Sequence, residues 1–307
     1  MGHENQPPDP PPLLESANAE MARALATAHQ VADSEAALLL IGESGTGKSV
    51  LARAIHSWSP RRTRPFVTVP RSAVRERPNG SAAVADLEWL RAADGGTLFL
   101  AEVAELPVAE QAKLIRFFDE PRWETHAGGL PVEADIRVIA ATTRDIEADV
   151  RAGRFREDLF FRLSVVTIAL PPLRHRPEDL AELIDHFVAR LTAYYERSPL
   201  RLTPEVQQRL RRYHWPGNVR ELWSVLERLV VLARGDMITA DELPDRLLAS
   251  RRGPGTAAAP EPLSLHELER RQIELALREC ATFEDAANRL GINATTLWRK
   301  RKRYGLT

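Results

Sequence analysis

The chain is poor in cysteine: Cys280 is the only one among 307 residues. A single cysteine cannot form an intramolecular disulfide, and the sequence has no Cys/His cluster of metal-ligand spacing, so a small disulfide- or zinc-stabilised fold is excluded. No apolar run is long enough to span a bilayer, and residues 1–12 lack the apolar core of a signal peptide. We therefore expect a cytoplasmic protein, with no membrane partner and a disordered tail over residues 1–13.

An excess of charge of one sign is also missing. The sequence has 42 Lys and Arg against 43 Asp and Glu, a net charge of −1. A uniformly basic nucleic-acid binder is therefore excluded, and any contact with DNA must come from a local patch. The hydrophobic content of 44% and the charged content of 28% are ordinary for a globular protein, and the length allows about two domains and a small module.

Residues 42–49 read Gly-Glu-Ser-Gly-Thr-Gly-Lys-Ser, a complete G-x-x-x-x-G-K-[S/T] phosphate-binding loop. An apolar run over 36–41 predicts a strand before the loop, and the spacing over 50–56 predicts a helix after it, which is the context that this motif requires. Glycines let backbone N–H groups surround a phosphate, and a helix N-terminus favours the anion. We expect ATP to bind Gly42, Glu43, Ser44, Gly45, Thr46, Gly47, Lys48 and Ser49, with Ser49 on Mg²⁺.

A second motif follows the apolar run over 97–100, which ends in Ala101-Glu102. P-loop ATPases carry an acidic pair at this point, one member for Mg²⁺ and one for the attacking water. Glu102 can act as the base, but Ala101 has no oxygen for the metal shell. Because Mg²⁺ keeps several waters, we expect nucleotide binding to survive, while charge compensation during hydrolysis is weakened.

Apolar periodicity divides the chain into regions. Residues 14–172 alternate expected strands (36–41, 66–69, 97–100, 136–141) with expected helices (84–93, 108–119, 146–152), which predicts an α/β domain with a parallel sheet. Residues 173–249 predict a smaller helical domain, with helices over 177–195, 204–213, 219–233 and 240–247. Residues 250–263 have the composition of a linker, and residues 264–307 predict an all-α module.

The last module has a helix-turn-helix pattern, with helices expected over 282–290 and 294–304 around Gly291 and Thr282 as an N-cap. It contains nine basic and six acidic residues, a net charge of +3. We expect Trp298 to pack in its core and the module to bind double-stranded DNA as a dimer. Base edges would meet Asn293, Thr295, Thr296 and Arg299, and phosphates would meet Lys300, Arg301, Lys302 and Arg303.

The phosphate loop and four further stretches resemble the bacterial enhancer-binding proteins, the sigma-54-dependent activators among the AAA+ ATPases. The stretches are Asp94–Leu100, Phe155–Leu163, Leu170–Arg176 and Trp215–Leu222. The resemblance covers residues from about 15 to 307, and the C-terminal half is similar to the response-regulator members that control alginate synthesis. It implies an AAA+ P-loop parallel sheet with a helical lid domain, followed by a Fis-type helix-turn-helix module.

The resemblance assigns further roles. Thr142 would sense the γ-phosphate, Arg156 and Arg162 would be arginine fingers that reach a neighbour's nucleotide, and Arg220 would be the second sensor, on the lid. The implied partners are operator or enhancer DNA, RNA polymerase holoenzyme and other copies of the chain, in a ring through the AAA+ domain. No receiver domain is expected before the core, so control would come from a partner, the expression level or nucleotide.

The chain departs from this family at three places. The sigma-contacting motif Gly-Ala-Phe-Thr-Gly-Ala is missing from residues 69–83, Pro70 replaces an Asn, and Ala101 replaces an Asp. We therefore expect no standard contact with sigma-54. Three functions stay open: a DNA-binding regulator that binds ATP, an active ATPase motor in which Glu102 or Glu105 replaces the missing acid, and a nucleotide-sensing scaffold without hydrolysis.

Overall fold

The computed structural model describes residues 15–69, 87–120, 122–124, 131–233, 235–248 and 282–289, and six single positions: Ile273, Leu277, Leu297, Trp298, Lys300 and Lys302. The chain divides into two units, Met1–Ser250 and Arg251–Thr307. Within the described stretches, no helix is long and apolar enough to cross a membrane.

A five-stranded parallel sheet lies at the centre of the first unit, in the order β2-β3-β6-β1-β7. Its strands are β1 (Leu38–Ile41), β2 (Phe66–Val69), β3 (Thr97–Leu100), β6 (Arg137–Thr142) and β7 (Val166–Ala169). Every residue of β3 and β6 is buried, as expected of strands covered on both faces. The α/β class is therefore confirmed.

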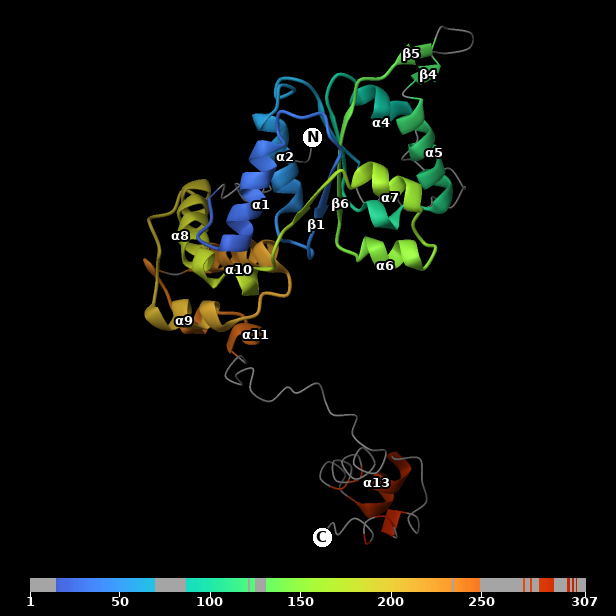
Figure 1. The fold of residues 1–307 in the computed structure, drawn as a ribbon. Helices are drawn as coiled ribbons and strands as arrows, with labels where there is room; N and C mark the ends of the chain where they lie inside the picture. Colours follow the sequence, from blue (N-terminus) through green and yellow to red (C-terminus); the bar gives the residue numbers. More distant parts are fainter. Residues whose placement is uncertain are drawn as a thin grey trace. The chain divides into compact units, whose positions relative to one another are not determined.

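Alternate strand residues pack on opposite faces of this sheet. Leu40 and Ile139 pack with α1 (Ala19–Gln30) and α2 (Lys48–Trp58). Leu39 and Val138 pack on the other face, whose helices are α4 (Leu87–Ala92), α5 (Val108–Asp119), α6 (Ile146–Arg151) and α7 (Glu157–Leu163). Figure 1 shows the blue helices α1 and α2 on one side of the sheet and the green helices on the other.

The register of the central strands brings three chain segments to one edge of the sheet. Leu100 of β3 pairs with Ala140 of β6, and Ile41 of β1 pairs with Thr142 of β6. The carboxyl ends of parallel strands meet at the same edge. The segments that follow β1, β3 and β6 therefore lie side by side, and they include the phosphate loop and Glu102.

A helical lid follows the sheet and has its own core around Phe187, Trp215 and Leu226. Its elements are η2 (Leu173–His175), α8 (Pro177–Tyr194), β8 (Arg201–Leu202), α9 (Pro204–Arg212), α10 (Asn218–Leu232), β9 (Met237–Ile238), η3 (Ala240–Glu242) and α11 (Asp245–Leu248). The single helix expected over 240–247 is wrong, since η3 and α11 are separate. Pro244 lies between them and has no N–H to continue a helix.

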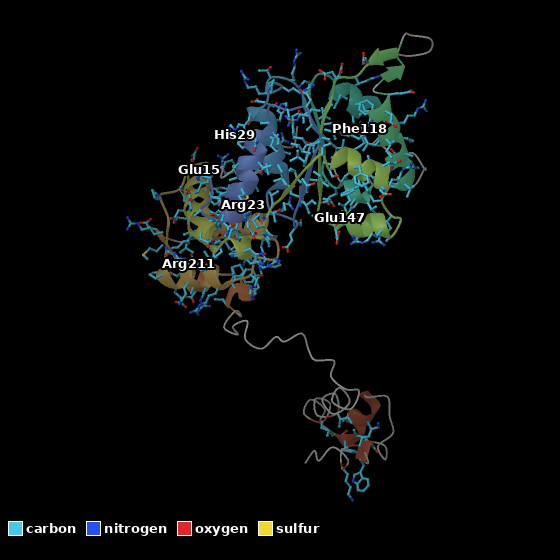
Figure 2. All side chains as sticks on the ribbon, viewed as in Figure 1. Glu15, Arg23, His29, Phe118, Glu147 and Arg211 are labelled. Atoms are coloured by element: carbon cyan, nitrogen blue, oxygen red, sulfur yellow. The ribbon has the colours of Figure 1, made fainter. Side chains whose placement is uncertain are left out.

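Two smaller features complete the first unit. A short antiparallel pair, β4 (Arg122–Glu124) and β5 (Pro131–Glu133), follows α5, and a 3-10 helix, η1 (Val103–Glu105), follows Glu102. Charged side chains of both signs extend from the outer faces of the helices, among them Arg23 and Glu147 (Figure 2). This mixed surface agrees with the near-zero net charge.

The described part of the second unit contains α13 (Phe283–Arg289), which lies within the helix expected over 282–290. The hydroxyl of Thr282 accepts a hydrogen bond from the N–H of Asp285 at 3.2 Å, as expected of an N-cap. The prediction that Trp298 packs in a core is wrong, because its side chain is 55% exposed. The neighbouring Leu297 is fully buried and takes the inward position.

Candidate nucleotide-binding site

The phosphate loop connects β1 to α2. It requires glycine where the backbone has a positive φ and where another backbone segment approaches closely. Gly45 and Gly47 have φ of 79° and 107°, values that favour residues without a Cβ. A Cβ on Gly45 would lie 2.2 Å from the carbonyl oxygen of Gly217, and one on Gly42 would lie 2.8 Å from that of Leu170. The loop is thus closely packed on its outer side, while its N–H groups and the α2 N-terminus remain suited to a phosphate.

Lys48 begins α2 and is 8% exposed. Its ammonium donates hydrogen bonds to the carbonyl oxygens of Gly42 at 2.7 Å and Glu43 at 2.9 Å, so it spans the loop. Burial lowers the pKa of Lys48, and the negative charge of Glu102 opposes that shift. A buried cation across a glycine loop at a helix N-terminus fits a nucleotide phosphate. Ser49 is exposed beside it.

Lid residues donate hydrogen bonds to backbone carbonyl oxygens on the outer side of the same loop. The amide of Asn218 donates to the carbonyl oxygen of Ser44 at 2.9 Å. The N–H groups of Val219 and Arg220 donate to that of Gly45 at 3.0 and 3.3 Å, and the guanidinium of Arg176 donates to that of Thr46 at 3.2 Å. Three consecutive loop carbonyls are therefore held by lid residues.

An ion pair joins the loop to the lid at Glu43. The Arg174 guanidinium binds both carboxylate oxygens of Glu43, at 2.6 and 2.8 Å, and the Asn218 amide donates to one of them at 3.2 Å. These bonds, that of Arg174 first, lower the pKa of Glu43 from its ordinary 4.5 to about 2. Arg220, the predicted second sensor, donates to the hydroxyl of Ser44 at 3.2 Å and so lies at the loop.

Glu102 lies at the end of β3 and is 9% exposed. One of its carboxylate oxygens accepts hydrogen bonds from the N–H of Thr143 at 2.9 Å and from its hydroxyl at 3.1 Å. Ala101 packs half-buried against the core of the α1 and α2 face and offers only a methyl group. The carboxylate at this edge of the sheet is therefore Glu102, oriented by Thr143.

Thr143 was not identified as a site residue from the sequence. The neighbouring Thr142 was expected to sense the γ-phosphate instead. Thr142 is fully buried, and its hydroxyl accepts a hydrogen bond from the N–H of Arg144 at 3.0 Å. Its role as a sensor stays a prediction. The signal for Thr143 was its place immediately after β6, the strand that neighbours β3.

The two predicted arginine fingers lie on the other side of the sheet from α1, at α7. Arg156 precedes the helix and binds Asp158, with N–O distances of 2.8 and 3.1 Å. Arg162 lies near the C-terminal end of the helix and binds Asp119 of α5 at 2.8 Å. Both side chains are exposed and bind carboxylates of their own subunit. Their action on a neighbour's nucleotide stays a prediction.

Most of the predicted DNA contacts lie outside the described residues: Asn293, Thr295, Thr296, Arg299, Arg301 and Arg303. Of the remaining two, Lys300 is half-buried and Lys302 is exposed. The ammonium of Lys302 lies 5.4 Å from the centre of the Trp298 ring. A cation and an exposed aromatic ring thus share one surface of this unit.

Three protein families match consecutive parts of the chain. They are the sigma-54 interaction domain over residues 14–169, the AAA+ ATPase lid domain over 174–260 and the bacterial regulatory proteins of the Fis family over 264–304. The first match alone covers half of the chain. The order of the three agrees with the order of sheet domain, lid and helix-turn-helix module expected from the sequence.

Individual relatives agree with this assignment. The alginate biosynthesis transcriptional regulatory protein AlgB of Pseudomonas aeruginosa is 41% identical over 305 residues, which cover 95% of this chain and 68% of AlgB. The response regulator protein PilR of the same species is 38% identical over 294 residues, 90% of this chain and 66% of PilR. The crystal structure of NtrX from Brucella abortus in complex with ATP has a TM-score of 0.69 and 31% identity, covering 97% of this chain and 70% of NtrX. The chain belongs to the sigma-54-dependent transcriptional regulators, which combine an AAA+ domain with its lid and a Fis-type helix-turn-helix.

Proposed function

We propose that this chain is a transcription regulator that binds ATP between its phosphate loop and its lid. The observation that carries the proposal is the buried Lys48 ammonium in a glycine loop whose outer carbonyls are held by lid residues. NtrX, a relative of the same fold, has been solved with ATP bound. In this chain Lys48 would bind the β- and γ-phosphates, and Arg220 would approach them from the lid.

Hydrolysis depends on the groups that follow β3. Glu102 is the proposed base, and its hydrogen bonds to Thr143 fix one oxygen so that the other can accept a proton from water. Mg²⁺, held by the Ser49 hydroxyl and the phosphates, would neutralise charge in the transition state. Because Ala101 contributes no oxygen to that metal shell, we propose that hydrolysis is slow and that the bound nucleotide mainly favours assembly.

Glu105 is a weaker substitute for the missing acid than Glu102. It lies in η1 and lines a cavity of about 560 Å³ together with Arg144 and Arg154. Glu105 thus lines a cavity beside the arginines that bind Asp149, whereas the charge of Glu102 acts on Lys48. This difference favours Glu102 as the acidic group of the nucleotide site.

Self-association and DNA binding complete the proposal. Arg156 and Arg162 would reach the nucleotide of the next subunit in a ring, where a guanidinium stabilises charge on a transferring phosphoryl group. Residues 264–307 would bind double-stranded DNA as a dimer, with Lys300 and Lys302 on phosphates. The Fis-family match over residues 264–304 supports this assignment.

Steady-state ATP hydrolysis with Mg²⁺, measured beside ATP binding by calorimetry, tests the nucleotide part. We expect the wild type to bind ATP and turn over slowly, Ala101→Asp to turn over at least tenfold faster, and Glu102→Ala to bind without turnover. Lys48→Ala should lose binding. A fast wild type that Ala101→Asp does not improve would instead make the chain a working motor.

The polymerase target is tested separately. Since residues 69–83 have no Gly-Ala-Phe-Thr-Gly-Ala motif, we propose that the protein does not open sigma-54 promoters by the standard contact. Purified protein, ATP and sigma-54 holoenzyme are incubated on a supercoiled template that carries the protein's own upstream site. Formation of heparin-resistant open complexes would overturn this part, and their absence, with a standard activator as positive control, is expected.

A further inference from the structure

Gln111 is a polar side chain on α5 that is completely buried. Its amide N–H₂ donates to the carbonyl oxygens of Leu106 at 2.8 Å and Arg154 at 3.1 Å. Its amide oxygen accepts a hydrogen bond from the N–H of Arg156 at 2.8 Å. Both donors and the acceptor of the amide are therefore used, which no apolar or charged side chain of similar size can reproduce.

These three bonds join two segments that are far apart in the sequence. Leu106 ends the short segment that begins at Glu102 and passes through η1. Arg154 and Arg156 lie in the segment that leads into α7. Phe155, between them, is buried in the same core as Val103 and Leu106. The carboxylate at the subunit's own nucleotide site and Arg156 are thus attached to one packed body.

A second connection runs between the same two segments on another path. Thr143, which binds Glu102, is followed by Arg144, whose guanidinium donates to a carboxylate oxygen of Asp149 at 2.8 Å. Arg154 donates to the same oxygen at 2.6 and 2.8 Å. Asp149 is 2% exposed, and its backbone carbonyl accepts the N–H groups of Arg154 and Phe155 at 2.9 and 3.2 Å.

We propose that Gln111 is a positioning residue that makes Glu102 and Arg156 move together. It would couple the Glu102 carboxylate, which acts on the subunit's own ATP, to the Arg156 guanidinium, which acts on the ATP of the neighbouring subunit. The proposal rests on the proposed function, in which Glu102 acts within the subunit and Arg156 acts across the interface. ATP bound to one subunit would then change the position of its Arg156 at the next subunit, because the buried amide of Gln111 joins the segment after Glu102 to the segment before α7.

Mixed oligomers test this coupling. All subunits carry Ala101→Asp so that turnover is measurable. One subunit carries Arg156→Ala and keeps Glu102, and the other carries Glu102→Ala and keeps Arg156. Each variant alone is expected to be inactive. A mixture should regain turnover at interfaces where Glu102 of one subunit meets Arg156 of the next. Adding Gln111→Leu to either subunit should lower the turnover of the mixture at least tenfold. Gln208→Leu, an exposed glutamine of α9, is the matched control and should leave turnover unchanged.

Each outcome decides the matter. A loss only when Gln111→Leu is in the subunit that keeps Arg156 would mean that Gln111 positions Arg156 alone, and a loss only in the subunit that keeps Glu102 would mean that it positions Glu102 alone. No loss in either arrangement would mean that it is structural. Each of these three results overturns the coupling. ATP affinity and the far-UV circular dichroism of each variant show whether it is folded. If the mixture without Gln111→Leu regains no turnover, the action of Arg156 across the interface has failed instead.

Amide hydrogen exchange tests the coupling in the unmodified protein and needs no hydrolysis. The N–H groups of Glu105, Leu106, Arg154 and Arg156 are followed with and without a slowly hydrolysed ATP analogue. We expect the two segments to exchange with the same opening rate and to gain the same protection factor from nucleotide. Independent rates in the two segments, or protection of only one of them, would overturn the proposal even if ATP binds normally.

Discussion

Thr143 orients Glu102 with two groups of different kinds, a backbone N–H and a hydroxyl. Thr143→Val removes only the hydroxyl. A hydrogen bond to a charged group contributes about 1.5 kcal/mol, so we expect kcat for ATP hydrolysis to fall about tenfold while ATP affinity is unchanged. Steady-state kinetics in the Ala101→Asp background measure this fall.

Thr142→Val is the control for that substitution. The Thr142 hydroxyl is buried and accepts the N–H of Arg144, so its loss should lower the free energy of unfolding by about 1–3 kcal/mol. Equal effects of the two substitutions on both kcat and stability would contradict the different roles that the two threonines have in the structure.

Gly45 and Gly153 both have positive φ, of 79° and 69°, but their surroundings differ. A Cβ on Gly153 would meet nothing within 4 Å, whereas one on Gly45 would lie 2.2 Å from the Gly217 oxygen. We expect Gly153→Ala to cost about 1 kcal/mol, for the left-handed backbone alone. Gly45→Ala should cost more and should also weaken ATP binding at least tenfold, because loop and lid must separate. Denaturant unfolding and calorimetry compare the two variants.

Some of these residues could not be assigned from the sequence. Thr142 and Thr143 are identical neighbours at the end of a strand, and only the register of β6 beside β3 decides which of them meets Glu102. Leu297 and Trp298 are a similar case, because both are apolar and adjacent on a predicted helix. The loop residues form a local and contiguous pattern, so the sequence places them together between β1 and the start of α2, as in the structure, while their contacts with ATP stay a prediction.

At the scale of elements, the ion pair between the loop and η2 has a pH dependence whose sign can be worked out. Glu43 has its pKa lowered from 4.5 to about 2 by Arg174 and Asn218. A lowered pKa stabilises the folded state above pH 4.5, and this contribution is lost as the pH falls toward about 2. Because the pair is more than a third exposed, we expect it to contribute no more than about 1 kcal/mol.

Denaturant unfolding of the wild type and Glu43→Gln across that pH range measures this contribution. The wild type should be the more stable protein at neutral pH, and the difference should shrink as the pH is lowered and vanish only below a pH of about 2. A difference that grows as the pH falls would contradict the ion pair. Arg174→Gln removes the other partner of the ion pair. In that background, Glu43→Gln should no longer change the pH dependence of stability.

Elements with strong local patterns were predicted well, and elements fixed by distant contacts were not. The helix expected over 108–119 has those bounds in the structure, where α5 follows Pro107. Strand β7, Val-Thr-Ile-Ala, was not predicted, although it resembles the predicted edge strand β2, Phe-Val-Thr-Val, in composition and burial; its place in the sheet depends on pairing with the distant strand β1. The attachment of the lid to the loop joins residues 130 or more apart in the sequence, which no local pattern reveals.

At the scale of the whole molecule, the near-neutral chain carries an uninterrupted basic run at positions 299–303. Replacing one phosphate-binding lysine should lower the salt dependence of DNA affinity by about one unit of the log–log slope. We expect Lys302→Ala to do this and to weaken binding to cognate and random duplexes equally. Lys113→Ala, whose side chain is bound to Glu110 on α5, should change neither. Fluorescence anisotropy over a salt series measures both slopes.

The three loop carbonyls that are held by the lid have a consequence for the kinetics of nucleotide exchange. Since the loop is ordered by protein groups from outside, little conformational entropy is lost when a triphosphate arrives, and association should be close to the rate of diffusional encounter. Because the same lid residues hold the loop carbonyls, we expect nucleotide release to require separation of the lid from the loop. We therefore expect the rate of lid opening to set the time for which each nucleotide stays bound.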